Sequence, residues 1–206
     1  MNEGWVQFGY TRKLKDVSFI KSQGHTPFDL IFDTCFLGAK PVKTHLDLST
    51  KLHHDSSNMF EDISIYRRLV GKLLYLTTTR TDIAFVTQHL SQFFHAPTKI
   101  HYETTCRVVK YMKGSPCRGL LFRRDAQLQL LGFSDADWAD CIDTRRSTSG
   151  YYFFLDSSLI LWRVTKQHTV LRSSFEAKYR VLSFASCELQ WLISLLEELE
   201  VKATKL

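Results

Sequence analysis

The stretch "LGFSDADWADC", from Leu131 to Cys141, places three aspartates within six residues at the end of an apolar run. On an extended strand Asp135 and Asp137 share one face, because side chains alternate with a period of two residues. Carboxylate oxygens are the ligands that Mg²⁺ prefers in proteins. The residues alone leave two interpretations open: a site for a divalent cation, or a solvated strand end whose aspartates cap a turn.

Strand-forming segments surround this stretch on both sides. They are "GLLFRR" (119–124) and "LQLLGFSD" (128–135), which flank a turn-like Asp125-Ala126, followed by "SGYYFFLD" (149–156), "LILWRVT" (159–165) and "HTVLRS" (168–173). These segments are rich in the aromatic and β-branched residues that favour strands. We expect residues 118–172 to form a three-strand antiparallel meander, with Asp135 and Asp137 on its first long strand.

A long helix is predicted to follow, from Ser174 to about Val201. Ser173 is a suitable N-cap residue, and Glu176 three residues later predicts a capping box. A 3-4 spacing selects positions 175, 178, 182, 185, 189, 192, 196 and 199, of which seven of eight are apolar. Such a stripe predicts a helix face that packs against the sheet. Lys178 is the exception in the stripe, and it needs a partner or a route to solvent.

Three helices with short connections are expected upstream of the strands. The first lies in "YRRLVGKLLYLTTT" (66–79), the second in "RTDIAFVTQHLSQFFHAP" (80–97), and the third begins after Thr98 and ends at Gly114. Their basic residues either contact phosphates or form an ordinary solvated face. The candidates for nucleic-acid binding are Arg67, Arg68, Lys72, Arg80, Arg107, Lys110 and Lys113.

The composition limits the class of protein. With 206 residues, 44% of them hydrophobic, the chain is long enough for one or two globular units. No apolar run reaches the length of a membrane span, and "MNEGWVQFGYTRKLKD" lacks the apolar core of a signal peptide. We therefore expect a cytoplasmic or nuclear protein that is not secreted and does not contact membranes. The formal net charge of +6 is compatible with a polyanionic partner.

A series of ordered motifs points to one family. The motifs are "SDADWA" (134–139), "RSTSGY" (146–151), Trp162, Lys166-Gln167, "SSFEAKY" (173–179) and "CELQWL" (187–192). In this order and spacing they resemble the RNase H segment of a copia-like retrotransposon Pol polyprotein. Upstream, "LGAKPVKTHLD" (37–47) and "YRRLVGKLLYLTTTRTDIAF" (66–85) resemble the segment that joins reverse transcriptase to RNase H in the same polyproteins.

The resemblance covers roughly residues 27–202 and implies a domain order. Residues 27–65 would be the loop-rich end of the reverse transcriptase region, 66–117 a helical connection, and 118–206 a partial RNase H-like domain. Residues 1–26 match no part of the family and are left unassigned. The expected fold class is therefore α+β, with a helical connection segment followed by a truncated RNase H-like unit.

The resemblance also implies chemistry. In the family, four acidic residues hold two Mg²⁺ ions that hydrolyse RNA in RNA–DNA hybrids, and Asp135 takes the position of the first of them. Asp137 is a weaker candidate ligand. The second carboxylate is expected at the last glutamate of Glu-Ala-Glu-Tyr, where this sequence has Lys178. Glu176 does not replace it, because two residues correspond to about 200° around a helix.

These departures predict that the chain is inactive as an enzyme. The resemblance places the third aspartate beyond Leu206, so we expect a truncated chain that does not bind Mg²⁺ tightly. The Lys178 ammonium is expected beside Asp135 or Asp137, where it would act as an internal counter-ion. The alternatives are a non-catalytic nucleic-acid-binding or protein-interaction module, with an RNA–DNA hybrid as one partner, or nuclease activity after association with a complementary fragment. An exposed sheet edge also predicts self-association.

Overall fold

A computed structural model describes residues 39–47, 50, 52–55, 58–116, 118–123 and 129–201, and the backbone of strand β1 (Trp5–Phe8). The predicted Asp125-Ala126 turn and most of residues 1–38 lie outside the described residues. The chain forms two compact units, one of residues 7–119 and one of residues 120–206 together with residues 1–6.

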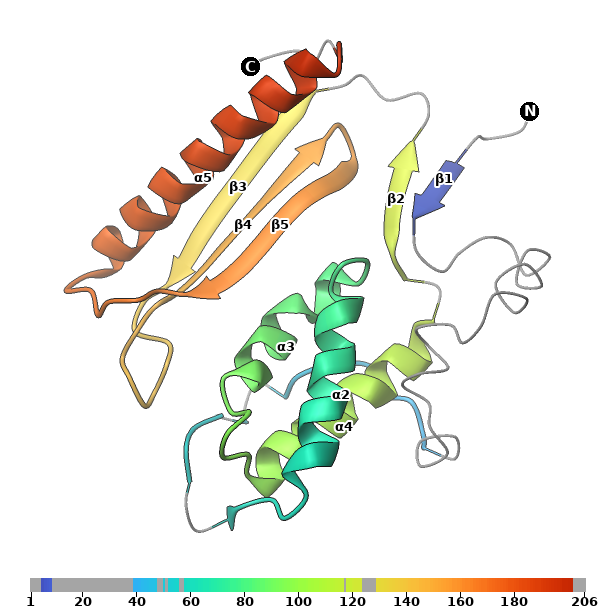
Figure 1. The fold of residues 1–206 in the computed structure, drawn as a ribbon, viewed down its shortest axis with the longest axis vertical. Helices are drawn as coiled ribbons and strands as arrows, with labels where there is room; N and C mark the ends of the chain where they lie inside the picture. The colour runs from blue at the N-terminus through green and yellow to red at the C-terminus, as the bar shows by residue number, and fades with distance from the viewer. Residues whose placement is uncertain are drawn as a thin grey trace. The chain divides into compact units, whose positions relative to one another are not determined.

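The first unit is helical. It contains α2 (Ile63–Leu76), a short 3₁₀ helix η4 (Thr81–Ile83), α3 (Ala84–Ser91) and α4 (Lys99–Gly114), as Figure 1 shows. The Asp62 carboxylate accepts the Ile65 N–H at 2.9 Å and caps α2, while Thr98 caps α4. The fully buried core consists of Tyr66, Val70, Leu73, Ile83, Val86, Leu90, Val108, Val109 and Met112. The three predicted helices are thus confirmed, including the end of the third at Gly114.

The second unit contains a three-stranded antiparallel sheet and one long helix. The strands β3 (Leu130–Asp137), β4 (Thr148–Leu155) and β5 (Ser158–Lys166) lie in the order β3-β4-β5. The register pairs Asp135 with Gly150 and Asp137 with Thr148. Helix α5 (Ser174–Glu198) runs along β3 (Figure 1). The α+β class and the meander followed by a long helix are confirmed.

Two predicted strands differ from the structure. Strand β2 (Leu120–Arg123) pairs with β1 and not with β3, so the meander begins at Leu130 and not near residue 118. Residues 168–173, predicted as a strand, form bends that carry the chain from the end of β5 to the start of α5. Leu171 in this connection is buried, so its apolar character reflects packing and not strand pairing.

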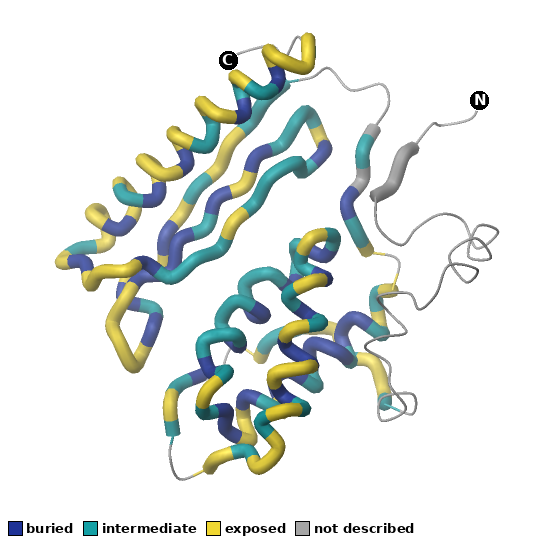
Figure 2. Tube along the Cα trace, viewed as in Figure 1, coloured by how far each residue is buried: buried dark blue, intermediate teal, exposed yellow. Residues whose placement is uncertain are grey.

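The predicted stripe on α5 is confirmed at Ala185, Leu192 and Leu196 and is wrong at Phe175, Leu182 and Leu199. Phe175 and Leu182 are 73% and 51% exposed, whereas the buried residues of α5 are Ala177, Val181, Ala185, Leu192 and Leu196. Tyr151 and Phe153 of β4 belong to the same core cluster and fill the space beneath the helix. Near the start of the helix the smaller Ala177 and Val181 are buried in this cluster, whereas the bulkier Phe175 and Leu182 lie outside it. Figure 2 shows exposed residues along the outer side of α5.

The start of α5 follows the predicted cap in part. Ser173 Oγ accepts the Glu176 N–H at 3.2 Å, which confirms Ser173 as the N-cap. The Glu176 carboxylate accepts the Arg172 N–H at 2.9 Å and so bonds one residue earlier than a capping box requires.

Among the described helices, none has both the length and the apolar character to cross a membrane.

Candidate functional site

The site begins at the end of β3. Ala136 is buried in the core beneath α5, so the two aspartates beside it leave the strand on the other face. The Asp135 side chain is 74% exposed, and Asp137 is also exposed. The strand therefore delivers both carboxylates to solvent on one face, as the alternation predicted.

Lys178 lies next to this pair. Its Nζ atom is 3.3 Å from Asp135 Oδ1, so the predicted contact between the lysine and the cluster is present. The Lys178 side chain is 61% exposed, however, and is not part of the buried face of α5. The lysine lies at the margin of the helix and reaches Asp135 at the edge of the sheet. Exposed ion pairs of this kind contribute about 0–1 kcal/mol to stability.

The two aspartates differ in their electrostatics. The Ala136 N–H and the Lys178 ammonium lower the pKa of Asp135, because both stabilise its charged form. The pKa of Asp137 is raised by loss of hydration and by the nearby Asp140 and Asp135 carboxylates, with Lys178 acting weakly in the opposite direction. Lys178 therefore stabilises the charged form of Asp135 more than that of Asp137.

Asp140, the third aspartate of the stretch, holds the turn that follows β3. Its Oδ2 atom accepts the Thr148 hydroxyl at 3.1 Å, and the Ala139 N–H donates to Ser147 Oγ at 3.1 Å. Ala139 has a φ of 53°, in the left-handed region that non-glycine residues rarely adopt. These bonds tie the turn to β4, so Asp140 has a structural task near the cluster.

The residues present do not fit a pair of divalent ions. Within the described ranges of the chain, no three His, Cys, Asp or Glu side chains lie close enough to hold a metal ion. A protonated lysine offers no lone pair, and it places a positive charge beside the carboxylate that a cation would need. Mg²⁺ is usually held by one or two carboxylates with water completing its coordination, but the resemblance calls for four acidic residues around two ions, and here Lys178 takes the place of one of them.

Arg80 must be removed from the predicted phosphate-binding residues. It is 2% exposed, and its guanidinium donates two hydrogen bonds of 2.9 Å to the Asp82 carboxylate. It also donates to the Ser115 carbonyl at 3.0 Å, and the Tyr111 hydroxyl donates to Asp82 at 2.8 Å. The guanidinium therefore connects the start of η4 to the end of α4. The nearby Asp82 was the sequence signal for this structural role.

The other six basic candidates are at least partly exposed. Arg67 and Arg68 are exposed on α2, although Arg67 Nε donates to the Phe94 carbonyl at 2.8 Å. Arg107 donates to Thr44, and the Lys113 ammonium donates to the Ala39 carbonyl at 3.0 Å. Lys72 and Lys110 are half-buried. Nucleic-acid binding by these residues stays a prediction.

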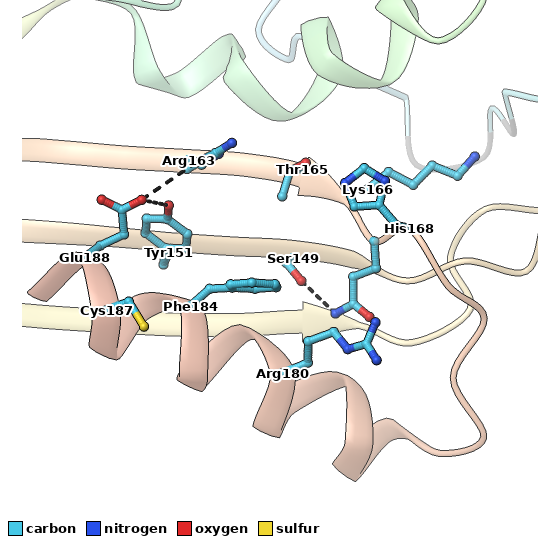
Figure 3. Close-up of a pocket in the computed structure, with 11 residues that line it drawn as sticks. Ser149, Tyr151, Arg163, Thr165, Lys166, His168, Arg180, Phe184, Cys187 and Glu188 are labelled. Carbon is cyan, nitrogen blue, oxygen red and sulfur yellow. Dashed lines mark hydrogen bonds and ion pairs between the residues drawn. The ribbon is translucent and has the colours of Figure 1, made fainter.

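The sequence did not reveal a pocket of about 330 Å³ between α5 and strands β4 and β5 (Figure 3). Its lining includes Arg163, Gln167, Arg180, Phe184 and Glu188. Arg180, Phe184 and Glu188 recur every four residues on α5, but no motif in the sequence joins them to Arg163 and Gln167. Only the tertiary structure brings them together.

Comparison with known proteins agrees with the motifs. The chain is 41% identical over 184 residues to "Retrovirus-related Pol polyprotein from transposon RE1" of Arabidopsis thaliana, a match that covers 89% of this chain. It is also 41% identical over 181 residues, or 88% of the chain, to the corresponding polyprotein from transposon RE2 of the same plant. The chain belongs to the copia-type retrotransposon Pol polyproteins. It spans only 13% and 12% of the length of these two Pol relatives.

A shorter relative covers part of the same Pol segment. "Secreted RxLR effector protein 161" of Plasmopara viticola is 43% identical over 128 residues, which are 62% of this chain and 90% of that protein. No family model matches the chain, and no solved structure matches it. Sequence similarity to the Pol polyproteins therefore identifies the family. The contact between Lys178 and Asp135 is a feature of this chain's own structure.

Proposed function

We propose that this Pol segment does not hydrolyse RNA–DNA hybrids, although its motifs resemble those of an RNase H segment. The observation that carries the proposal is the 3.3 Å contact between Lys178 Nζ and Asp135 Oδ1. The lysine neutralises the carboxylate that the resemblance makes the first metal ligand. A cation would have to approach Asp135 against this ammonium, so binding of Mg²⁺ or Mn²⁺ should be weak.

The test restores the carboxylate at position 178. Calorimetric titration with Mn²⁺ should show weak binding by the natural chain and tighter binding by the Lys178→Glu variant. Changing a positive to a negative charge at a solvent-exposed site should alter the affinity by about tenfold or more. Lys43→Glu makes the same change of charge at an exposed lysine of the helical unit, which is not part of the candidate site, and serves as a matched control. It should leave Mn²⁺ affinity close to that of the natural chain.

A cleavage assay completes the experiment. The natural chain should leave a labelled RNA–DNA hybrid intact in the presence of Mg²⁺ or Mn²⁺. Specific metal-dependent cleavage by the purified natural chain would overturn the proposal. Strong Mn²⁺ binding that is equal in the natural chain and the Lys178→Glu variant would overturn the counter-ion role of the lysine.

A second candidate function is nucleic-acid binding by the helical unit. It is favoured by the adjacent, exposed Arg67 and Arg68 on α2 and by the net charge of +6. Hybrid affinity should fall with salt concentration, because each phosphate contact releases counter-ions. Replacing both arginines by glutamine should reduce the slope of log K against log salt by about one to two. A slope that is unchanged in the double variant would exclude these residues.

A further inference from the structure

Helix α5 leaves one side of the sheet's inner face uncovered. An α-helix is about 10 Å wide and adjacent strands lie about 4.8 Å apart, so one helix covers about two strands. Here α5 packs mainly on β3 and less on β4. The inner side of β5, which carries Arg163 and Thr165, therefore borders an open groove. This groove is the pocket of about 330 Å³ shown in Figure 3.

One flank of α5 supplies an ordered wall to this groove. Arg180, Phe184 and Glu188 follow one another at intervals of four residues and all line the pocket. At a rise of 1.5 Å per residue, the backbone positions of the first and last lie about 12 Å apart. Figure 3 shows Phe184 between the Arg180 end and the Glu188 end. The wall thus presents a cation, an aromatic ring and an acid in sequence.

The two ends of the groove have different chemistry. At one end Arg180 is accompanied by His168, and Arg180 Nη1 donates to the Thr169 hydroxyl. At the other end Glu188 Oε1 accepts the Tyr151 hydroxyl at 3.0 Å and lies 3.7 Å from Arg163 Nη1. Within the described part of the chain, both of these contacts are made by Oε1. Glu188 Oε2 is therefore available to accept a hydrogen bond from a ligand.

A buried amide lies beside the cationic end. Gln167 is 4% exposed and lines the pocket; its Nε2 atom donates to Ser149 Oγ at 2.7 Å and to the Ala177 carbonyl at 3.3 Å. Its Oε1 atom accepts no hydrogen bond from any residue that the structure describes. Buried acceptors are seldom left without a donor, so a hydroxyl or N–H group is expected there.

We propose that this groove binds a nucleoside monophosphate whose base carries an exocyclic amino group. The phosphate lies beside Arg180 and His168, because guanidinium groups bind phosphate through paired N–H donors. The base stacks on Phe184, and its amino group donates to Glu188, as acidic side chains accept from the amino group of cytosine. A sugar hydroxyl supplies the donor for Gln167. This site is separate from the aspartate cluster and does not depend on the proposed absence of cleavage.

The experiment titrates the full chain with cytidine monophosphate and follows binding by calorimetry and by NMR shifts of the Phe184 ring. Uridine monophosphate, cytidine and inorganic phosphate are the comparison ligands, and each should bind at least about tenfold more weakly. Arg180→Gln should weaken cytidine monophosphate binding by at least about tenfold. Arg146→Gln, which removes an exposed arginine outside the groove, should leave it unchanged.

Two further variants keep the test decisive if Arg180→Gln perturbs folding. Phe184 is 53% exposed, so Phe184→Leu should fold normally and still weaken binding. Glu188→Gln should abolish the preference for cytidine over uridine monophosphate. The proposal is overturned if cytidine monophosphate does not bind, if phosphate alone binds equally well, or if Arg146→Gln weakens binding as much as Arg180→Gln. Binding by a cytidine oligonucleotide but not by the free nucleotide would also overturn it.

Discussion

Lys178 places a positive charge beside the aspartate cluster at the end of β3. Asp135, Asp137 and Asp140 bring three carboxylates into one turn and strand end. The ammonium 3.3 Å from Asp135 offsets one of these charges and lowers the pKa of that carboxyl. At this scale the proposed weak binding of metal ions depends on a single side chain, because the Lys178 ammonium occupies a position next to Asp135 that a cation would need.

This view predicts how the two carboxyls titrate. NMR titration of the Asp side chains should give a lower pKa for Asp135 than for Asp137 in the natural chain. Lys178→Met should raise the pKa of Asp135 and affect Asp137 less, because Lys178 is the smallest influence on the latter. An Asp135 titration that does not change in Lys178→Met would contradict the ion pair.

The same shifts have opposite effects on stability. The depressed pKa of Asp135 favours the folded state above the unfolded-state pKa, and this contribution is lost as pH falls through the folded-state pKa. The raised pKa of Asp137 makes its ionised form unfavourable to folding at neutral pH, and protonation on acidification relieves this. Because both residues are exposed, each effect should stay within about 1 kcal/mol.

At the scale of elements, Gly132 on β3 leaves room for the ring of Phe153 on β4. A Cβ atom added there would lie 2.5 Å and 2.8 Å from two ring carbons of Phe153, which is 2% exposed. Phe153 also belongs to the core beneath α5, so its ring has little room to move. The absence of a side chain at Gly132 is therefore part of how α5 and the sheet fit together.

Gly132→Ala should reduce the free energy of unfolding by about 1–3 kcal/mol, since the Phe153 ring must leave its position. Gly150→Ala is the matched control on the neighbouring strand, because its nearest atom, the Arg163 carbonyl oxygen, would lie 3.9 Å away. That variant should be close to neutral. Denaturant unfolding of both variants measures the difference, and equal stabilities would show that the ring yields easily.

At the scale of the whole molecule, β3 forms an edge of the three-stranded sheet. Edge strands present backbone N–H and C=O groups that can pair with another chain. Phe133 on this strand is 50% exposed and stacks on Tyr152 of β4, with ring centroids 5.4 Å apart. The strand edge thus offers both hydrogen-bonding groups and apolar surface to a second copy.

We expect the chain to self-associate as its concentration rises, which sedimentation velocity would detect. Phe133→Lys places a charge on the edge strand and should shift the equilibrium toward monomer. Tyr152→Lys changes an aromatic of similar exposure, 44%, on the central strand and should have a smaller effect. A monodisperse monomer at high concentration would contradict association through this edge. Equal effects of the two variants would point to the sheet face instead.

The sequence by itself determined the elements whose signals are local. Apolar periodicity and the caps Thr98 and Ser173 predicted α2 to α5, because a helix repeats its contacts every three or four residues. Strand alternation placed Asp135 and Asp137 on one face. The motif around Lys178 also marked it as the residue that departs from the family, before any contact was known.

The tertiary structure alone decided which side chains are buried and which residues from distant segments meet. Periodicity cannot tell that Ala177 and not Leu182 is buried at the helix–sheet contact, or that Arg80 is buried where it reaches the distant Ser115 carbonyl. It also cannot assemble the groove between α5 and β5, whose lining comes from three separate elements. These features depend on shape complementarity and charge pairing across the fold, and neither has a repeat along the chain.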